Sequence, residues 1–224
     1  MRFPGPARYR WSARIYDVIS LERPLYLAGR LRGIDLLHLQ PGQIVLDVGC
    51  GTGLNFAHLQ AQVGPTGRIV GVDNSAQMLA QARRRAKRAG WSNVVLLRTD
   101  AAELDPATVR DATSGLAGAD AGADAVLATY ALSVITGWEQ AWMRACLAAA
   151  PGARFAVVDL ALPTGRASWL TPLARLACAA GGSDPHRAPG MLARRAATDL
   201  TRVDLRGGHV TVDAGTLSGP APHP

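Results

Sequence analysis

A glycine-rich corner between an apolar run and a helical segment constrains this chain more than any other stretch. Residues 45–55 read VLDVGCGTGLN, so strand-forming residues give way to alternating glycines and then to a segment, 54–63, with helical character. Glycine permits positive φ and lets a ligand approach bare backbone, and a helix N-terminus directs unpaired amide hydrogens into the same space. The corner therefore predicts a ligand site.

The spacing of the glycines limits which ligand fits. They stand at 49, 51 and 53, so the third glycine of a G-x-G-x-x-G dinucleotide pattern would fall on Leu54, and no Gly-Lys-Ser/Thr of a P-loop follows. Asp73 closes the later run RIVGVD, where a carboxylate at a strand end can accept both ribose hydroxyls of a nucleoside. The pattern favours adenosine without pyrophosphate; a tight turn without a ligand is the alternative interpretation.

Three motifs in this region resemble those of the class I S-adenosylmethionine-dependent methyltransferases. LDVGCGTG (46–53) matches their first motif, GVDNS (71–75) the acidic end of their second strand, and RTDAAE (98–103) the loop that faces the adenine. The resemblance implies that S-adenosyl-L-methionine is the cofactor. No metal site is expected, because the three cysteines lie too far apart in the sequence for zinc-ligand spacing. The cofactor-binding residues expected from the resemblance are Tyr16, Asp47, Gly49, Gly51, Gly53, Asn55, Asp73, Asn74, Met78, Asp100, Ala101 and Thr129.

Alternation of strand-like and helix-like segments predicts an α/β fold with a doubly wound, mostly parallel sheet. The expected strands lie at 45–48, 68–73, 94–97, 125–129, 155–159, 203–205 and 209–212. Helices are expected at 54–63, at 138–149, at 172–180, at 191–200 and between a Ser75 cap and Gly90, with a turn at 151–152. The resemblance implies seven strands, of which the last is inserted antiparallel as part of a closing hairpin around 207–208.

One domain accounts for all 224 residues, because 48% hydrophobic content suits a single sizeable core. We expect a helical lid at 8–40, a cofactor-binding core at 41–160, substrate-side helices with the closing hairpin at 161–217, and a tail at 218–224. Within the lid, four apolar residues recur along one face of a helical segment after Pro24: Leu27, Leu31, Ile34 and Leu37.

Aromatic and imidazole side chains indicate where an acceptor would lie. The pattern Tyr9-x6-Tyr16-Asp17 is similar to the N-terminal tyrosine signature of methyltransferases that act on lipid head groups and quinones, although an amphipathic helix with core tyrosines is the alternative. Tyr130 follows the fourth strand, where ligands bind in open α/β sheets. Tyr9, Tyr16, Tyr130 and His186 are therefore acceptor-site candidates, none of them an obligatory catalyst, and His186 or His209 could act as base toward a hydroxyl acceptor.

The charge balance bears on the partner. The net charge is +7, and seven arginines stand against two carboxylates within residues 1–32, which can attract an anionic membrane surface. Nucleic acid is disfavoured, because residues 129–132 read TYAL where DNA amino-methyltransferases carry Asn/Asp-Pro-Pro-Tyr/Phe. No apolar run reaches the roughly 18 residues of a membrane span, and three scattered cysteines are typical of a reducing compartment. A cytoplasmic protein is expected, with peripheral contact at the inner membrane surface left open.

Three functions remain open from the sequence. The first is methyl transfer to a small-molecule or lipid head-group acceptor, an amine in the first place, by in-line displacement. The whole-chain pattern resembles the phosphatidylethanolamine and betaine-lipid N-methyltransferases. The second is a soluble O- or C-methyltransferase of a quinone, phenol or natural product. The third is a non-catalytic nucleoside-binding protein.

Overall fold

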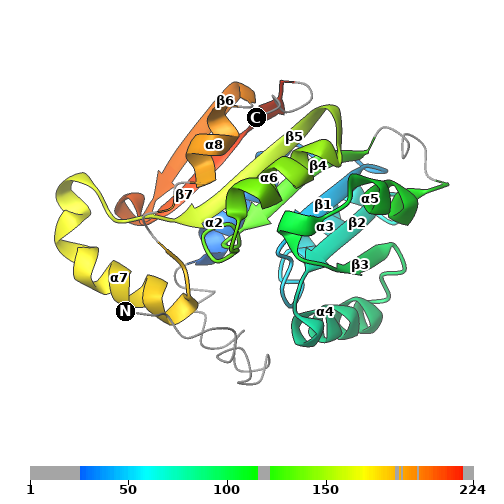
Figure 1. Cartoon of the computed structure of the whole chain (residues 1–224), viewed down its shortest axis with the longest axis horizontal. Coiled ribbons are helices and arrows are strands. Elements are labelled where there is room, and N and C mark those ends of the chain that lie inside the picture. The colour runs from blue at the N-terminus through cyan, green and yellow to red at the C-terminus, as the bar shows by residue number, and fades with distance from the viewer. Residues whose placement is uncertain (1–25, 116–121, 185–186, 188, 196, 219–224) are drawn as a thin grey trace.

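The computed structural model describes residues 26–115, 122–184, 187, 189–195 and 197–218. Seven strands form one sheet in the order β3-β2-β1-β4-β5-β7-β6 (Figure 1). The strands are β1 Ile44–Val48, β2 Arg68–Asp73, β3 Val94–Arg98, β4 Ala123–Thr129, β5 Ala149–Leu160, β6 Ala197–Leu205 and β7 Val210–Leu217. The first five pair in parallel, and β7 runs antiparallel between β5 and β6. The predicted fold class is confirmed, including the inserted last strand.

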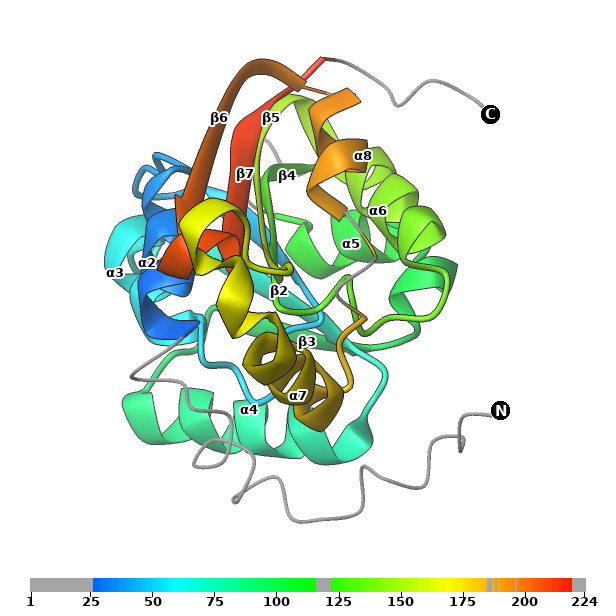
Figure 2. The same cartoon turned by 90° about the vertical axis from the view of Figure 1, so that its left-hand side faces the viewer.

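Helices cover both faces of the sheet, as Figure 2 shows from the side. One layer holds α2 (Leu27–Asp35), α3 (Phe56–Val63) and α4 (Ala76–Ala89), and the other holds α5 (Pro106–Thr113), α6 (Trp138–Leu147) and α8 (Pro189–Arg195). Alternate residues of β1 serve the two layers, since Val45 packs with the first layer while Ile44, Leu46 and Val48 pack with the second. Among the described ranges, no helix combines the length and the apolar character needed to cross a membrane.

In the part of the chain that the structure describes, four further helical elements connect the strands and helices of these layers. They are the 3₁₀ turns η3 (Ala101–Glu103), η5 (Gly165–Leu170) and η6 (Arg206–Gly208), and the helix α7 (Thr171–Gly181). The expected ends of α4 are confirmed, because the Ser75 side chain accepts a bond from the Met78 amide at 3.3 Å and Gly90 adopts a left-handed conformation with φ +73°.

Two boundaries predicted around β5 and β6 are wrong. The turn expected at 151–152 lies within β5, where pairing with β4 shifts from Ala123–Ala149 to Ala125–Arg154. The helix expected at 191–200 ends at Arg195, and β6 begins at Ala197, which pairs with Leu217 of β7. At Ala197 pairing with β7 prevails over local propensity. At 151–152 an irregularity of β5 remains, because the register with β4 shifts there and Gly152 has a positive φ of +75°.

Of the four apolar residues expected on one face, Ile34 and Leu37 are buried, at 1% and 0% exposed, but the face of α2 that approaches the sheet differs in part from the expectation. Leu31 is 41% exposed, whereas Gly29 and Gly33 are buried against the sheet. A Cβ on Gly29 would lie 2.4 Å from the Tyr130 hydroxyl oxygen, and one on Gly33 would lie 2.3 Å from a methyl carbon of Val158. The two glycines thus let α2 approach the sheet more closely than a leucine face would. The remainder of the expected lid, 8–25, lies outside the described residues.

Candidate functional site

The three glycines after β1 all adopt positive φ, but they do so for different reasons. Their φ values are +67° at Gly49, +55° at Gly51 and +77° at Gly53. A Cβ on Gly49 would meet the Cβ of Ala131 at 2.5 Å, and one on Gly53 would meet the Phe56 ring at 2.6 Å, whereas no described atom lies within 4 Å of one on Gly51. Gly49 and Gly53 therefore allow close packing, and Gly51 borders open space that a ligand can occupy.

Asp47 places a buried carboxylate behind this corner. Its side chain is 0% exposed, and the Asn55 side-chain amide donates to Oδ1 at 2.7 Å. Oδ2 has no hydrogen-bond partner among the described residues. Burial raises the pKa of Asp47 to about 7, and the bond from Asn55 and the Arg30 charge oppose that rise. A buried oxygen without a partner is uncommon, and here it is suited to a cationic group on a ligand.

Arg30 of α2 joins this cluster, and the sequence analysis missed it. Its guanidinium donates to Asn55 Oδ1 and, at 3.0 Å, to Thr129 Oγ1, and it lies 5.7 Å from the centre of the Tyr130 ring. Arg30 is only 6% exposed. No motif in the sequence distinguishes Arg30 from the other 22 arginines, and it does not belong to the apolar face predicted for this helix. The one signal was its position between Gly29 and Gly33, which mark the side of α2 that approaches the sheet.

Asp73, at the end of β2, is hydrogen-bonded to the glycine corner. Its Oδ2 accepts from the Gly51 amide at 3.0 Å, and its Oδ1 accepts from the Ser75 amide at 2.8 Å. Burial raises the pKa of Asp73, while these two bonds oppose the rise. The structure thus brings the acidic residue of the second motif into direct contact with the one glycine of the first motif that borders open space.

The other expected cofactor residues follow β2 and β3. Asp100 begins η3, because its Oδ1 accepts from the Ala102 amide at 2.9 Å. Met78 and Ala101 are each 7% exposed, and Asn74 is exposed. Because β1, β2 and β3 are parallel neighbours, these residues lie along the same carboxyl edge of the sheet as the glycine corner.

Tyr130, which directly follows β4, has a strained backbone conformation. Its φ is +55°, which is rare for a bulky residue and is most often found at functional sites. The hydroxyl donates to the Tyr26 carbonyl at 2.7 Å, and the two rings lie 5.0 Å apart between centres. Tyr130 therefore ties the start of α2 to the end of β4, next to Arg30. Tyr9, Tyr16 and His186 lie outside the described residues.

His209, a possible base toward a hydroxyl acceptor from the sequence, is buried. It is 7% exposed, and its Nδ1 lies 2.8 Å from the Ala161 carbonyl oxygen, so the ring joins the start of β7 to the segment after β5. A ring held in this way is a buried structural contact rather than an accessible base.

A second polar cluster fixes the loops that follow β4 and β5. The hydroxyl of Ser133 donates to Asp159 Oδ1 at 2.5 Å and lies 2.6 Å from the hydroxyl of Ser183, and the Asp184 amide donates to the Ser133 carbonyl at 3.2 Å. Burial raises the pKa of Asp159, and its bonds from Ser133 and Leu160 oppose that rise. The segment between Leu160 and Asp184 thus leaves and returns at the same sheet edge.

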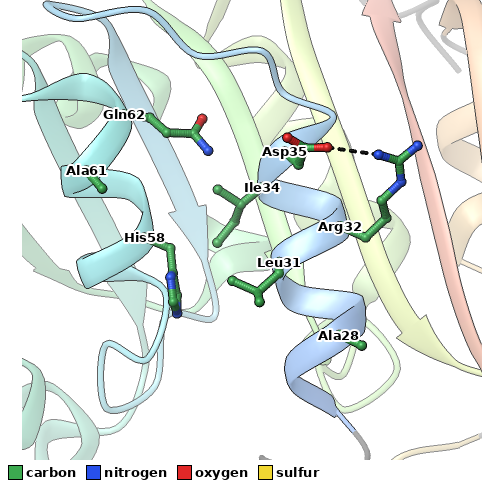
Figure 3. A pocket seen from close by; sticks show the side chains of 8 residues that line it. All are labelled: Ala28, Leu31, Arg32, Ile34, Asp35, His58, Ala61 and Gln62. Carbon is green, nitrogen blue, oxygen red and sulfur yellow. Dashed lines mark hydrogen bonds and ion pairs between the residues drawn. The ribbon is translucent and has the colours of Figure 1, made fainter.

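A groove of about 560 Å³ lies elsewhere, between α2 and α3 (Figure 3). Leu31, Ile34, His58 and Gln62 line it, and Asp35 at its margin is paired with Arg32 at 2.8 Å. Asp47 and the residues of its hydrogen-bonded cluster, Arg30, Asn55 and Thr129, do not line this groove. We assign no ligand to it.

A family model described as a methyltransferase domain matches residues 45–152. The demethylmenaquinone methyltransferase of Listeria welshimeri is 36% identical over 91 residues, which are 41% of this chain and 38% of the relative. The chain spans less than two fifths of the length of the first curated relatives that it matches.

Solved structures share the fold at low identity. An S-adenosylmethionine-dependent methyltransferase from Aquifex aeolicus superposes with a TM-score of 0.65 at 16% identity, over 93% of this chain and 100% of the other. Phospholethanolamine N-methyltransferase 2 of Haemonchus contortus, in complex with phosphomonomethylethanolamine and S-adenosylhomocysteine, gives 0.64 at 17% identity over 88% of this chain and 44% of the other. At these identities, the two structures support the fold alone.

Proposed function

This chain carries a class I S-adenosylmethionine-dependent methyltransferase domain, and from that premise we propose that it transfers a methyl group from S-adenosyl-L-methionine to a small, largely apolar acceptor. The observation that carries the proposal is the geometry at the glycine corner. Gly51 borders open space, Asp73 accepts from its amide, and Asp47 Oδ2 is buried without a partner among the described residues.

The charges at the corner fit the two ends of the cofactor. Asp47 would bind the methionyl ammonium and Arg30 the methionyl carboxylate, because charge-assisted hydrogen bonds of this kind are the strong ones. Asp73 would bind the ribose hydroxyls, and Met78 with Asp100 and Ala101 would border the adenine. Asn55 donates to both Asp47 and Thr129, and Arg30 donates to Thr129. This network fixes the positions of Asp47 and Arg30 relative to each other.

The cofactor supplies an activated methyl group on a sulfonium, and the protein has to hold an acceptor in line with it in a dry site. Orientation of this kind can supply roughly 7–11 kcal/mol of the barrier, so no obligatory catalytic residue is assigned. Tyr130 and Tyr26 offer aromatic surface beside the cluster, and a planar acceptor would pack against them.

A neutral acceptor fits the described edge better than a cationic amine. The sequence contains no aspartate or glutamate between Asp159 and Asp184, the segment that leaves and returns at this edge. Asp159 itself is buried and bonded to Ser133, and the Arg30 guanidinium adds positive charge at the corner. A quinol or phenol is therefore preferred to the amine head group that the sequence resemblance favoured. The activity named for the Listeria relative supports the same choice.

Methyl-labelled S-adenosyl-L-methionine tests the proposal with two acceptors, a reduced naphthoquinone that lacks its ring methyl group and vesicles containing phosphatidylethanolamine. We expect label in the quinol and none in the lipid. Label in the lipid alone would restore the amine acceptor. Calorimetric titration of the cofactor runs in parallel, and absence of cofactor binding would indicate that the chain does not use this cofactor at all.

Replacement of Arg30 with methionine should weaken cofactor binding by about tenfold to a hundredfold, because a hydrogen bond to a charged group contributes roughly 1.5–3 kcal/mol. Arg32→Met is the matched control, since Arg32 lies on the same helix but pairs with Asp35 at the surface. Isothermal titration of both variants measures the effect. Equal affinities in the two variants would remove Arg30 from the site.

A further inference from the structure

Three large apolar side chains are exposed along η5 and α7. Trp169 is 75% exposed, Leu173 63% and Leu176 67%. Their spacing of four and three residues places them on one side of a helix, while Ala174 and Cys178 on the other side are 5% and 0% exposed. Figure 1 shows α7 at the left-hand edge of the molecule, away from the helices that cover the sheet. No described residue covers this apolar face, which we call the α7 face.

The α7 face lies at the edge of the sheet that carries the candidate site. The segment that contains it starts where β5 ends, at Leu160, and returns where the Asp184 amide donates to the Ser133 carbonyl, just after β4. The carboxyl ends of β1 and β4 form the same edge, because the two strands are parallel neighbours. The segment that carries the α7 face therefore leaves from and returns to the edge of the sheet that also carries the glycine corner.

The segment between Asp159 and Asp184 carries only positive charge. Between Asp159 and Asp184 the sequence has no carboxylate, and the exposed Arg175 lies between Leu173 and Leu176 in the chain. Helices that lie in the interface of a bilayer typically combine tryptophan and leucine with arginine and lack acidic residues, and this segment has that composition. An anionic surface complements this charge and accepts the apolar side chains.

Charge also argues against two other occupants. A second copy docked through a two-fold interface would bring one Arg175 toward the other, since such an interface pairs the same patch with itself. The amino-terminal residues 1–25 carry five arginines against two carboxylates, so they would bring like charge to Arg175.

We propose that the α7 face docks reversibly on the surface of an anionic lipid membrane, with Trp169, Leu173 and Leu176 inserted among the lipids. Docking would place the carboxyl edge of the sheet next to the bilayer, from which an apolar acceptor could enter. That last clause rests on the proposed function, whereas docking itself does not.

Sedimentation with vesicles tests docking without any turnover. The full chain should bind vesicles of equal parts phosphatidylcholine and phosphatidylglycerol, should bind phosphatidylcholine alone far less, and should lose affinity as salt rises. The double variant Leu173→Ser with Leu176→Ser should bind the anionic vesicles at least about tenfold more weakly. Leu147→Ser, at a residue 44% exposed at the end of α6, is the matched control and should bind as the unmodified chain does.

The remaining measurements separate docking from its alternatives. Arg175→Glu should reduce anionic binding while keeping the apolar face, and all variants should retain cofactor binding by calorimetry. Unchanged vesicle binding by the double variant would overturn the proposal. It would also fail if light scattering showed a dimer that the double variant loses, or if deletion of residues 2–22 alone abolished vesicle binding. Loss of turnover with vesicle binding intact would count against the proposed function and not against docking.

Discussion

Replacement of Gly51 with leucine should abolish cofactor binding while leaving the fold intact. No described atom lies within 4 Å of a Cβ at this position, so the new side chain has room in the ligand-free protein. That room is the space assigned to the cofactor, and the added side chain would exclude it. We expect affinity for S-adenosyl-L-methionine to fall by at least about a hundredfold, with methyl transfer lost to the same extent.

Gly90→Leu is the control that isolates this effect. Gly90 also has positive φ, +73°, and open space around a Cβ, but it ends α4 away from the glycine corner. Both variants therefore lose about 1–2 kcal/mol of stability to the left-handed backbone. Thermal denaturation should show the same loss in both, and calorimetry should show lost binding in Gly51→Leu alone. A Gly51→Leu protein that binds the cofactor normally would contradict the site.

The core of the fold was predictable because its elements are local. Apolar runs of strand character mark β1 to β4, a glycine follows β1 and an aspartate ends β2, and a serine and a glycine bound α4, so short-range chemistry and the final structure agree in this part of the chain. Prediction failed where partners were distant in sequence. Residues 197–200 were assigned to a helix because nothing local shows that β7 pairs with them. The shift of register in β5 likewise depends on how β4 lies beside it.

The same distinction holds for the candidate site. The glycine corner and Asp73 carry recognisable motifs, and the structure brings Gly51 and Asp73 into contact. Arg30 carries no motif, because its role depends on Gly29 and Gly33 allowing α2 to approach Tyr130 and Val158. In this approach α2 packs on residues of β4 and β5 that lie more than 90 positions later in the chain. The periodicity of a single helix does not reveal a contact of this kind.

Asp47 makes the ligand-free protein and its complex respond to pH in opposite directions. In the ligand-free protein burial raises the pKa of Asp47 to about 7, above the unfolded value of 3.8. The folded state thus holds this proton more tightly than the unfolded chain does. The associated stability is fully present below the unfolded pKa and is lost as pH rises through about 7. Asp47→Asn should remove this dependence and raise stability above neutral pH, by an amount on the order of a few kcal/mol.

Cofactor binding should have the reverse dependence, because an ammonium beside Asp47 favours the charged carboxylate and lowers its pKa. Below pH 7 the proton must leave before the salt bridge forms, so affinity should fall by up to about tenfold for each pH unit between roughly pH 7 and pH 5. Titration calorimetry in two buffers of different ionisation enthalpy would count the protons, and we expect about one released near pH 6. Asp47→Asn should bind weakly and release none, whereas Asp105→Asn, which retains a capping side chain at the start of α5, should behave as the unmodified chain. If the unmodified chain released no proton, the carboxylate would already be charged before the cofactor arrives, and burial could not be what sets its pKa.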